Sequence, residues 1–96
     1  MEGRLLFRLL TPAGEVCSLQ CDSVILCEKD NSQRQGGSLG IRPGHLPAVI
    51  ALEEKAPVRA MSQGKDVYRA LVRGGFARVE PSSVTVLTPE AEVKAE

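Results

Sequence analysis

Short apolar segments separated by turn residues run along almost the whole chain, and this spacing limits the fold more than any other feature. The segments are rich in β-branched residues, and clusters of Gly, Pro, Asp or Ser interrupt them about every eight to twelve residues. No window of about ten or more residues carries an apolar stripe of helical period. The pattern predicts an all-β fold, a two-sheet antiparallel β-sandwich of about eight to ten short strands.

Alternation of apolar and polar residues places some of the individual strands, and short β-branched apolar runs place the others. Residues 62–66 separate two of them as a hairpin connector does. Residues 28–37 are polar and end in glycine, so we interpret them as an exposed loop. We expect strands at residues 5–9, 15–20, 23–27, 48–52, 58–61, 67–72, 76–79 and 84–87.

Length and charge exclude several classes of function. The chain has 96 residues, enough for one domain. Its 12 basic and 12 acidic residues are scattered and give a formal net charge of zero, which argues against a nucleic-acid or membrane-surface partner. The apolar runs are too short to span a bilayer, and the first residues do not resemble a signal peptide. We expect a cytosol-like compartment, with membrane association only through partners.

Residues 37–47 combine three glycines, two prolines and the only histidine. Pro43 and Gly44 suit the central positions of a type II turn. We interpret His45 as a turn or interface residue, because no acid–base partner can be assigned to it from the sequence. The chain has no nucleophile elbow and no phosphate-binding loop. We therefore expect no catalytic residue, no bound nucleotide and no cofactor.

The three cysteines, Cys17, Cys21 and Cys27, have neither an even count nor a CxxC spacing. The favoured interpretation is free thiols in strands. A zinc site would need a fourth ligand, from His45 or a carboxylate, so we expect no metal. An enzyme or metal protein that uses His45 with the cysteines is the least favoured alternative.

The end of the chain differs from the rest. Thr88, Pro89 and Glu90 have the order of a helix opening, with a hydroxyl N-cap, a proline and then an acid. We therefore divide the chain into a sandwich at residues 1–88 and a polar tail at residues 89–96. The tail is too short for an isolated helix in water.

The order of strands and turns resembles the epsilon subunit of F-type ATP synthases, in particular its N-terminal β-sandwich domain. The similarity extends from about residue 5 to residue 91, and residues 39–47, LGIRPGHLP, are its most specific part, close to the family's LGILPGHAP. The other matching segments are LLTPAGE at 9–15, CDSVIL at 21–26, GGFARV at 74–79 and VTVLT at 84–88.

The resemblance implies a non-catalytic rotor subunit that clamps the gamma subunit to the c-subunit ring. It would couple proton or sodium ion flow to ATP synthesis, with one copy per complex, peripherally on the cytoplasmic side of the bacterial inner membrane. It also implies the roles of individual residues. These are ring contacts at Gly37, Ser38, Leu39 and Gly40, gamma contacts at Thr11 and His45, and structural turns at Pro43, Gly44, Gly74 and Gly75.

The chain also departs from the family pattern. Ser38 stands where the family commonly has an acid, Arg78 replaces a glutamate, and the loop at residues 28–37 is longer than usual. The C-terminal helical hairpin is missing, so the resemblance implies coupling without self-inhibition and without ATP binding. A free-standing β-sandwich adaptor outside the rotor remains the second interpretation, supported by Ser38 and the longer loop.

Overall fold

The computed structural model describes residues 4–30 and 36–94, and these residues form ten strands and no helix. None of the described segments is therefore a helix that could cross a membrane. The strands are β1 (Leu5–Thr11), β2 (Gly14–Cys21), β3 (Ser23–Glu28), β4 (Gly37–Ile41), β5 (Ala48–Ala51), β6 (Ala56–Ser62), β7 (Lys65–Val72), β8 (Phe76–Glu80), β9 (Ser83–Leu87) and β10 (Ala91–Val93).

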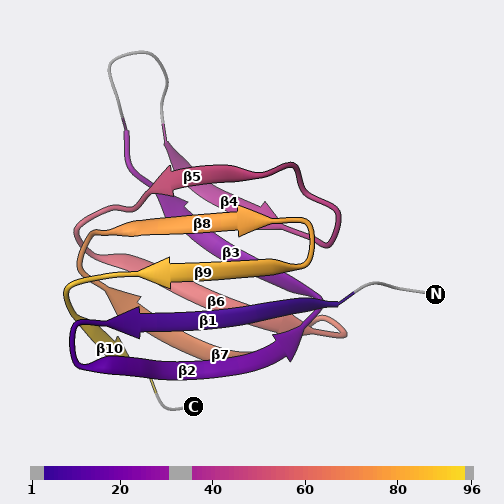
Figure 1. Cartoon of the computed structure of the whole chain (residues 1–96), viewed down its shortest axis with the longest axis horizontal. Helices are drawn as coiled ribbons and strands as arrows, with labels where there is room; N and C mark the ends of the chain where they lie inside the picture. The colour runs from indigo at the N-terminus through magenta and orange to yellow at the C-terminus, as the bar shows by residue number, and fades with distance from the viewer. Residues whose placement is uncertain (1–3, 31–35, 95–96) are drawn as a thin grey trace.

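The strands form two five-stranded sheets that pack face to face (Figure 1). Sheet A has the order β2-β1-β9-β8-β5, and sheet B has the order β10-β7-β6-β3-β4. All pairings are antiparallel except that of β1 with β9, which is parallel. The predicted β-sandwich is confirmed, with one parallel pair that the local pattern did not indicate.

The core lies between the sheets, because every second residue of most strands is apolar and points inward. On β1 the buried residues are Leu5, Phe7 and Leu9, and on β9 they are Val84 and Val86. Sheet B contributes the facing side chains, among them Val24, Leu26, Val58 and Val72. The rings of Phe7 and Tyr68, one from each sheet, lie 5.8 Å apart between centroids.

Turns at the expected positions join the strands. Gln63 and Gly64 both have positive φ, 53° and 76°, as the two central residues of a type I′ hairpin turn require. Gly44 has a φ of 88°, and the His45 amide donates a hydrogen bond of 3.3 Å to the carbonyl of Arg42. The turn from Arg42 to His45 is therefore a type II turn, with Pro43 and Gly44 at its centre.

Two strands were not predicted, and one of them corrects an expectation. Residues 37–41 form strand β4, although their glycines indicated only a shaped surface segment. Residues 91–93 form β10, which pairs with β7, so the predicted helix opening is wrong. The sandwich therefore continues past the boundary at residue 88. Of the expected loop at residues 28–37, residues 31–35 lie outside the described residues.

Candidate interaction surface

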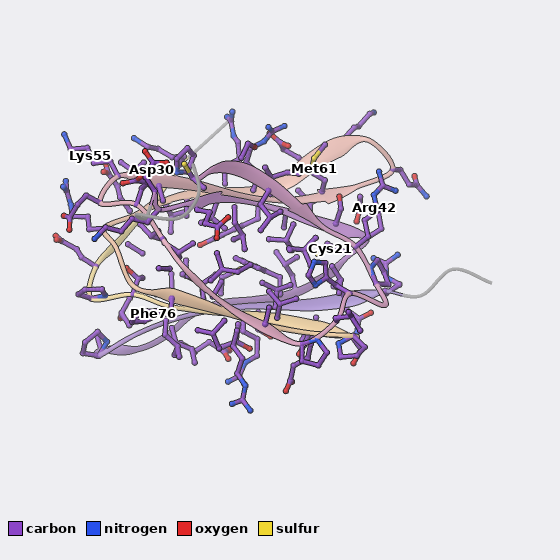
Figure 2. All side chains as sticks on the ribbon, turned by 90° about the horizontal axis from the view of Figure 1, so that it is seen from above. Cys21, Asp30, Arg42, Lys55, Met61 and Phe76 are labelled. Atoms are coloured by element: carbon purple, nitrogen blue, oxygen red, sulfur yellow. The ribbon has the colours of Figure 1, made fainter. Side chains whose placement is uncertain are left out.

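The three cysteines lie in β2 and β3. No group of three or more His, Cys, Asp or Glu side chains among these residues could hold a metal ion. Cys21 is buried between the sheets (Figure 2), and its Sγ lies 3.8 Å from the carbonyl oxygen of Leu5. Burial raises the pKa of the Cys17 and Cys21 thiols, which disfavours the reactive thiolate. The third cysteine, Cys27, lies half-buried in β3.

His45 lies in the loop between β4 and β5 and is half-buried. Its Nδ1 is 2.8 Å from the carbonyl oxygen of Leu46, to which it donates when Nδ1 carries the proton. The Gly44 amide donates a 2.7 Å hydrogen bond to the carbonyl of Pro81, in the turn between β8 and β9. That bond fixes the loop against the end of sheet A. The neighbouring Leu46 is 79% exposed.

Thr11 lies at the last residue of β1, where its Oγ1 accepts a 3.2 Å hydrogen bond from the Ala13 amide. Gly74 and Gly75 lie at the same end of the sandwich, with φ of 74° and 103°. They connect β7 to β8, while the Leu52 amide donates to the Gly75 carbonyl at 3.0 Å. These contacts hold the ends of several strands together beside Thr11.

The two residues expected to contact gamma do not meet. The register of sheet A aligns Leu10, next to Thr11, with Leu87, Phe76 and Ala51 in turn. All of these lie at the end of the sandwich where β1 ends, whereas the loop that carries His45 lies at the opposite end (Figure 1). A partner that touches both residues must therefore extend along sheet A.

The outer face of sheet A carries exposed apolar side chains, two of them at the Thr11 end and one farther along the sheet. Phe76, Leu87 and Val49 are 55%, 47% and 70% exposed. They occupy outward positions, because their neighbours along each strand are buried. Figure 2 shows Phe76 on this layer of the molecule. We call the paired residues Leu10, Leu87, Phe76 and Ala51 the apolar row.

A shallow hollow of about 590 Å³ lies at the Thr11 end of the apolar row. Such exposed apolar side chains are typical of surfaces that contact another protein. The hollow is lined by Leu10, Thr11, Pro12, Gly75, Phe76, Leu87, Thr88 and Pro89.

The residues expected to contact the ring lie together on one edge. Gly37, Ser38, Leu39 and Gly40 are the first four residues of β4, which is an edge strand of sheet B. Ser38 and the two glycines are exposed, and Leu39 packs partly on the core. Among the described strands β4 pairs with β3 alone, so its other side leaves backbone groups open to a partner.

Comparison with known proteins identifies the family. The family model described as the ATP synthase delta/epsilon chain β-sandwich domain matches residues 4–94. The chain belongs to this family. The resemblance found in the sequence is therefore confirmed for the β-sandwich domain.

Bacterial epsilon chains are among the relatives of this β-sandwich domain. The ATP synthase epsilon chain of Mycobacterium avium (strain 104) is 42% identical over 60 residues, which are 62% of this chain and 50% of the relative. The epsilon chain of Bacillus thuringiensis (strain Al Hakam) is 38% identical over 84 residues, 88% of this chain and 57% of the relative. The chain thus spans about half the length of the curated relatives it matches.

Two solved structures share the fold of this β-sandwich domain. A chain of the Euglena gracilis mitochondrial ATP synthase, in a structure of its OSCP, F1 and c-ring, matches with a TM-score of 0.75 at 20% identity. The match covers 97% of this chain and 55% of that one. A chain of the central stalk and c-ring of the Tetrahymena thermophila enzyme has a TM-score of 0.66 at 17% identity, over 94% and 66% of the two chains.

The sequence did not indicate the apolar row as part of a site. Phe76 and Leu87 were expected only as members of strands. The alternation along each strand could have indicated them. Each is a large apolar residue next to a residue expected to be buried, so each must face outward. Only the pairing of β9 with both β8 and β1 places them side by side.

Proposed function

We propose that this chain is a non-catalytic central-stalk subunit of an F-type ATP synthase. It holds the gamma subunit against the c-subunit ring and so couples proton or sodium ion flow to ATP synthesis. Membership of the delta/epsilon β-sandwich family, together with the exposed apolar row, carries this proposal. The bacterial relatives favour a peripheral location on the cytoplasmic side of the bacterial inner membrane.

In this proposal the gamma subunit lies along the outer face of sheet A. Thr11 contacts it at one end of the sheet and His45 at the other. Gamma would also cover three exposed apolar side chains of this face, Phe76, Leu87 and Val49. Truncation of a well-packed apolar side chain at the centre of an interface commonly weakens binding by ~1–2 kcal/mol or more.

The edge strand β4 is the proposed contact with the ring. Gly37, Ser38 and Gly40 have small or no side chains, so a polar loop of the ring could approach the backbone of β4 closely. Ser38 offers a hydroxyl and no charge, so this contact would depend on hydrogen bonds more than on ion pairs. Such a contact depends little on salt concentration.

A part that transmits torque must deform little under load, and the sandwich suits this role. Its two sheets share one close-packed core, and such interiors have low compressibility. Hydrogen bonds of loop residues add further constraints, such as those from Gly44 to Pro81 and from Gly74 to the carbonyl of Glu53 at 2.9 Å.

The test uses two matched variants and reconstituted partners. Leu87 and Val67 are 47% and 49% exposed, but Val67 lies in sheet B. Leu87→Ser should weaken binding to purified gamma about tenfold, whereas Val67→Ser should leave it unchanged. Binding is measured by titration calorimetry, and circular dichroism checks that each variant is folded.

Two outcomes would contradict the proposal. Equal effects of the two variants would place the gamma contact elsewhere. A folded chain that binds neither gamma nor the c-subunit ring would favour an adaptor that acts outside the rotor.

A further inference from the structure

Basic side chains outnumber acidic ones along hollows on the outer face of sheet B. The chain has 12 basic and 12 acidic residues, so its formal charges balance overall. Three neighbouring hollows on this face, of about 610, 410 and 360 Å³, are lined by five basic and two acidic side chains. The basic residues are Arg42, Arg59, Lys65, Arg69 and Lys94, and the acidic residues are Asp22 and Asp66.

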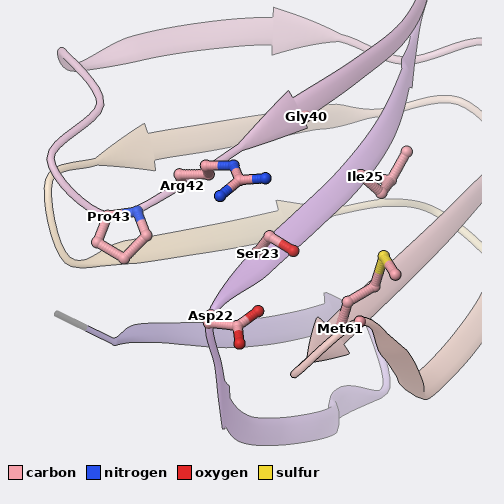
Figure 3. Close-up of a pocket in the computed structure, with 8 residues that line it drawn as sticks. Asp22, Ser23, Ile25, Gly40, Arg42, Pro43 and Met61 are labelled. Carbon is pink, nitrogen blue, oxygen red and sulfur yellow. The ribbon is translucent and has the colours of Figure 1, made fainter. Parts of the chain in front are cut away.

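The three hollows adjoin one another along strand β6. The first two share Met61 and Gly64, and the second and third share Arg59 and Arg69. Figure 3 shows the first of them, with Arg42 extending toward β3, the strand that carries Ser23. We call these three connected hollows the basic groove.

Only part of the positive charge in the basic groove is neutralised. Asp66 accepts hydrogen bonds from Arg59 at 3.0 and 3.1 Å, and Arg69 lies 3.9 Å away from the same carboxylate. One carboxylate thus serves two guanidinium groups. Lys94, in turn, lies with its Nζ 3.8 Å from a carboxylate oxygen of Glu92. Lys65 and Arg42 make no ion pair with any of the described residues. A partner that enters the groove therefore meets an excess of positive charge.

The first and third hollows also have apolar side chains in their lining. Ile25 and Met61 line the first hollow, and Pro57 and Leu71 line the third. An occupant that matches both features needs carboxylates for the basic side chains and aliphatic side chains for the apolar ones. This description of the occupant does not depend on whether gamma binds sheet A.

We propose that the basic groove binds an acidic segment of a partner protein that also carries aliphatic side chains. The groove is on the opposite side of the sandwich from the apolar row (Figure 2), so both partners can bind at once. An anionic membrane is the less favoured occupant. A flat lipid surface would contact projecting side chains, whereas the guanidinium group of Arg59 is held on Asp66 by two of its nitrogen atoms.

The test titrates the isotope-labelled chain with a peptide of alternating glutamate and leucine, observed by NMR. The expected result is that amide signals shift along β6 and at Lys65, and that affinity falls as salt concentration rises. The double variant Arg42→Glu, Lys65→Glu should bind the peptide at least severalfold more weakly. Both residues lack ion pairs, so the variant should remain folded.

The matched control reverses a charge on the other face. Arg78→Glu, on the outer face of sheet A, should leave peptide affinity unchanged. Neither the double variant nor its control tests gamma binding, so this proposal and the rotor proposal can fail separately.

Three results would overturn the proposal. The first is no binding, or equal binding of a peptide of alternating lysine and leucine. The second is signal shifts that map to sheet A. The third is binding of anionic lipid vesicles that the double variant abolishes, without binding of the acidic peptide, which would assign the groove to a membrane.

Discussion

Single residues in this sandwich are constrained most strongly where two strands meet closely. Gly75 has a φ of 103°, and a Cβ there would collide with the Leu87 carbonyl oxygen and lie 2.8 Å from the Thr88 Cα. Its neighbour Gly74 has a φ of 74°, but a Cβ there would lie 3.7 Å from the nearest atom, Oε2 of Glu54. Both glycines thus have positive φ, but only Gly74 has room for a Cβ atom.

This difference gives the first prediction. Gly75→Ala should lower the free energy of unfolding by about 2–4 kcal/mol, because strain and a backbone clash add. Gly74→Ala should lower it by only about 1–2 kcal/mol, the usual effect of a left-handed conformation for a residue with a Cβ. Guanidinium denaturation of both variants measures these values. Equal losses would mean that the backbone near Leu87 moves aside without difficulty.

Tyr68 is the only tyrosine of the chain, and its buried hydroxyl has no conventional hydrogen-bond partner within the described part of the chain. Burial, and then the adjacent Cys17, raises the pKa of Tyr68 from 10.0 to about 12. Between these values the unfolded chain binds fewer protons than the folded one, so stability should fall as pH rises from 10 to 12.

The second prediction follows from this raised pKa. Between pH 10 and 12 the free energy of unfolding should fall by up to about 2 kcal/mol. Tyr68→Phe should abolish the share of this fall that comes from ionisation of the tyrosine. The raised pKa values of Cys17 and Cys21 act in the same direction, so some loss above pH 9 remains in the variant. Denaturation at several pH values measures stability, and ultraviolet absorbance follows tyrosinate. A tyrosinate midpoint at the ordinary value would refute the burial argument.

At the scale of elements, β10 shows how an edge strand is held. The Arg73 amide donates to the Glu90 carbonyl at 3.0 Å, and the Lys94 amide donates to the Arg69 carbonyl at 2.9 Å. Because alternate residues of a strand point their amides the same way, the Glu92 amide faces β7 and the Val93 amide faces away. The register pairs Glu92 with Leu71 and agrees with this reading.

The third prediction compares proline at these two positions of β10. Glu92→Pro should remove a hydrogen bond to β7, reduce stability by about 1 kcal/mol or more, and speed hydrogen exchange of the Arg73 amide. Val93→Pro should have a smaller effect on stability and on hydrogen exchange, since the Val93 amide faces away from β7 and donates no hydrogen bond to that strand. Hydrogen exchange followed by NMR distinguishes the two variants. If Val93→Pro sped hydrogen exchange of the Arg73 amide as much as Glu92→Pro, the register of β10 on β7 would be wrong.

The molecule as a whole has one core between two faces of different character. Val24 of sheet B is fully buried in the same cluster as Phe7 of sheet A. Its neighbour Ile25 is only half-buried and lines the basic groove. A fault in the core should therefore affect both sheets together, whereas a change on an outer face should stay local.

The fourth prediction tests this shared core. Val24→Asp buries a charge without a partner and should remove most of a total stability of about 5–15 kcal/mol. Hydrogen exchange should then speed up in β9 of sheet A as much as in β3. Ile25→Asp is the control and should cost far less, because its side chain can reach water. Loss of protection confined to sheet B would mean that the two sheets unfold separately.

The sequence by itself determined the local structure of most of the chain. Alternation of apolar and polar residues, together with short β-branched apolar runs, indicated eight of the strands, because a strand places successive side chains on opposite faces. Glycine and proline gave the turns, as Gly44 and Gly64 illustrate. The sequence also indicated the family, through residues 39–47 and the other segments that match the family pattern. These features are local, so neighbouring residues suffice to specify them.

Only the tertiary structure decided which strands are neighbours and which side chains share a face. Thr88, Pro89 and Glu90 have the order of a helix start, yet pairing with β7 makes the following residues a strand. The parallel pairing of β1 with β9 brings Leu10 beside Leu87, and the same fold sends Thr11 and His45 to opposite ends. Local pattern cannot specify such contacts, because they depend on packing between residues far apart in the chain.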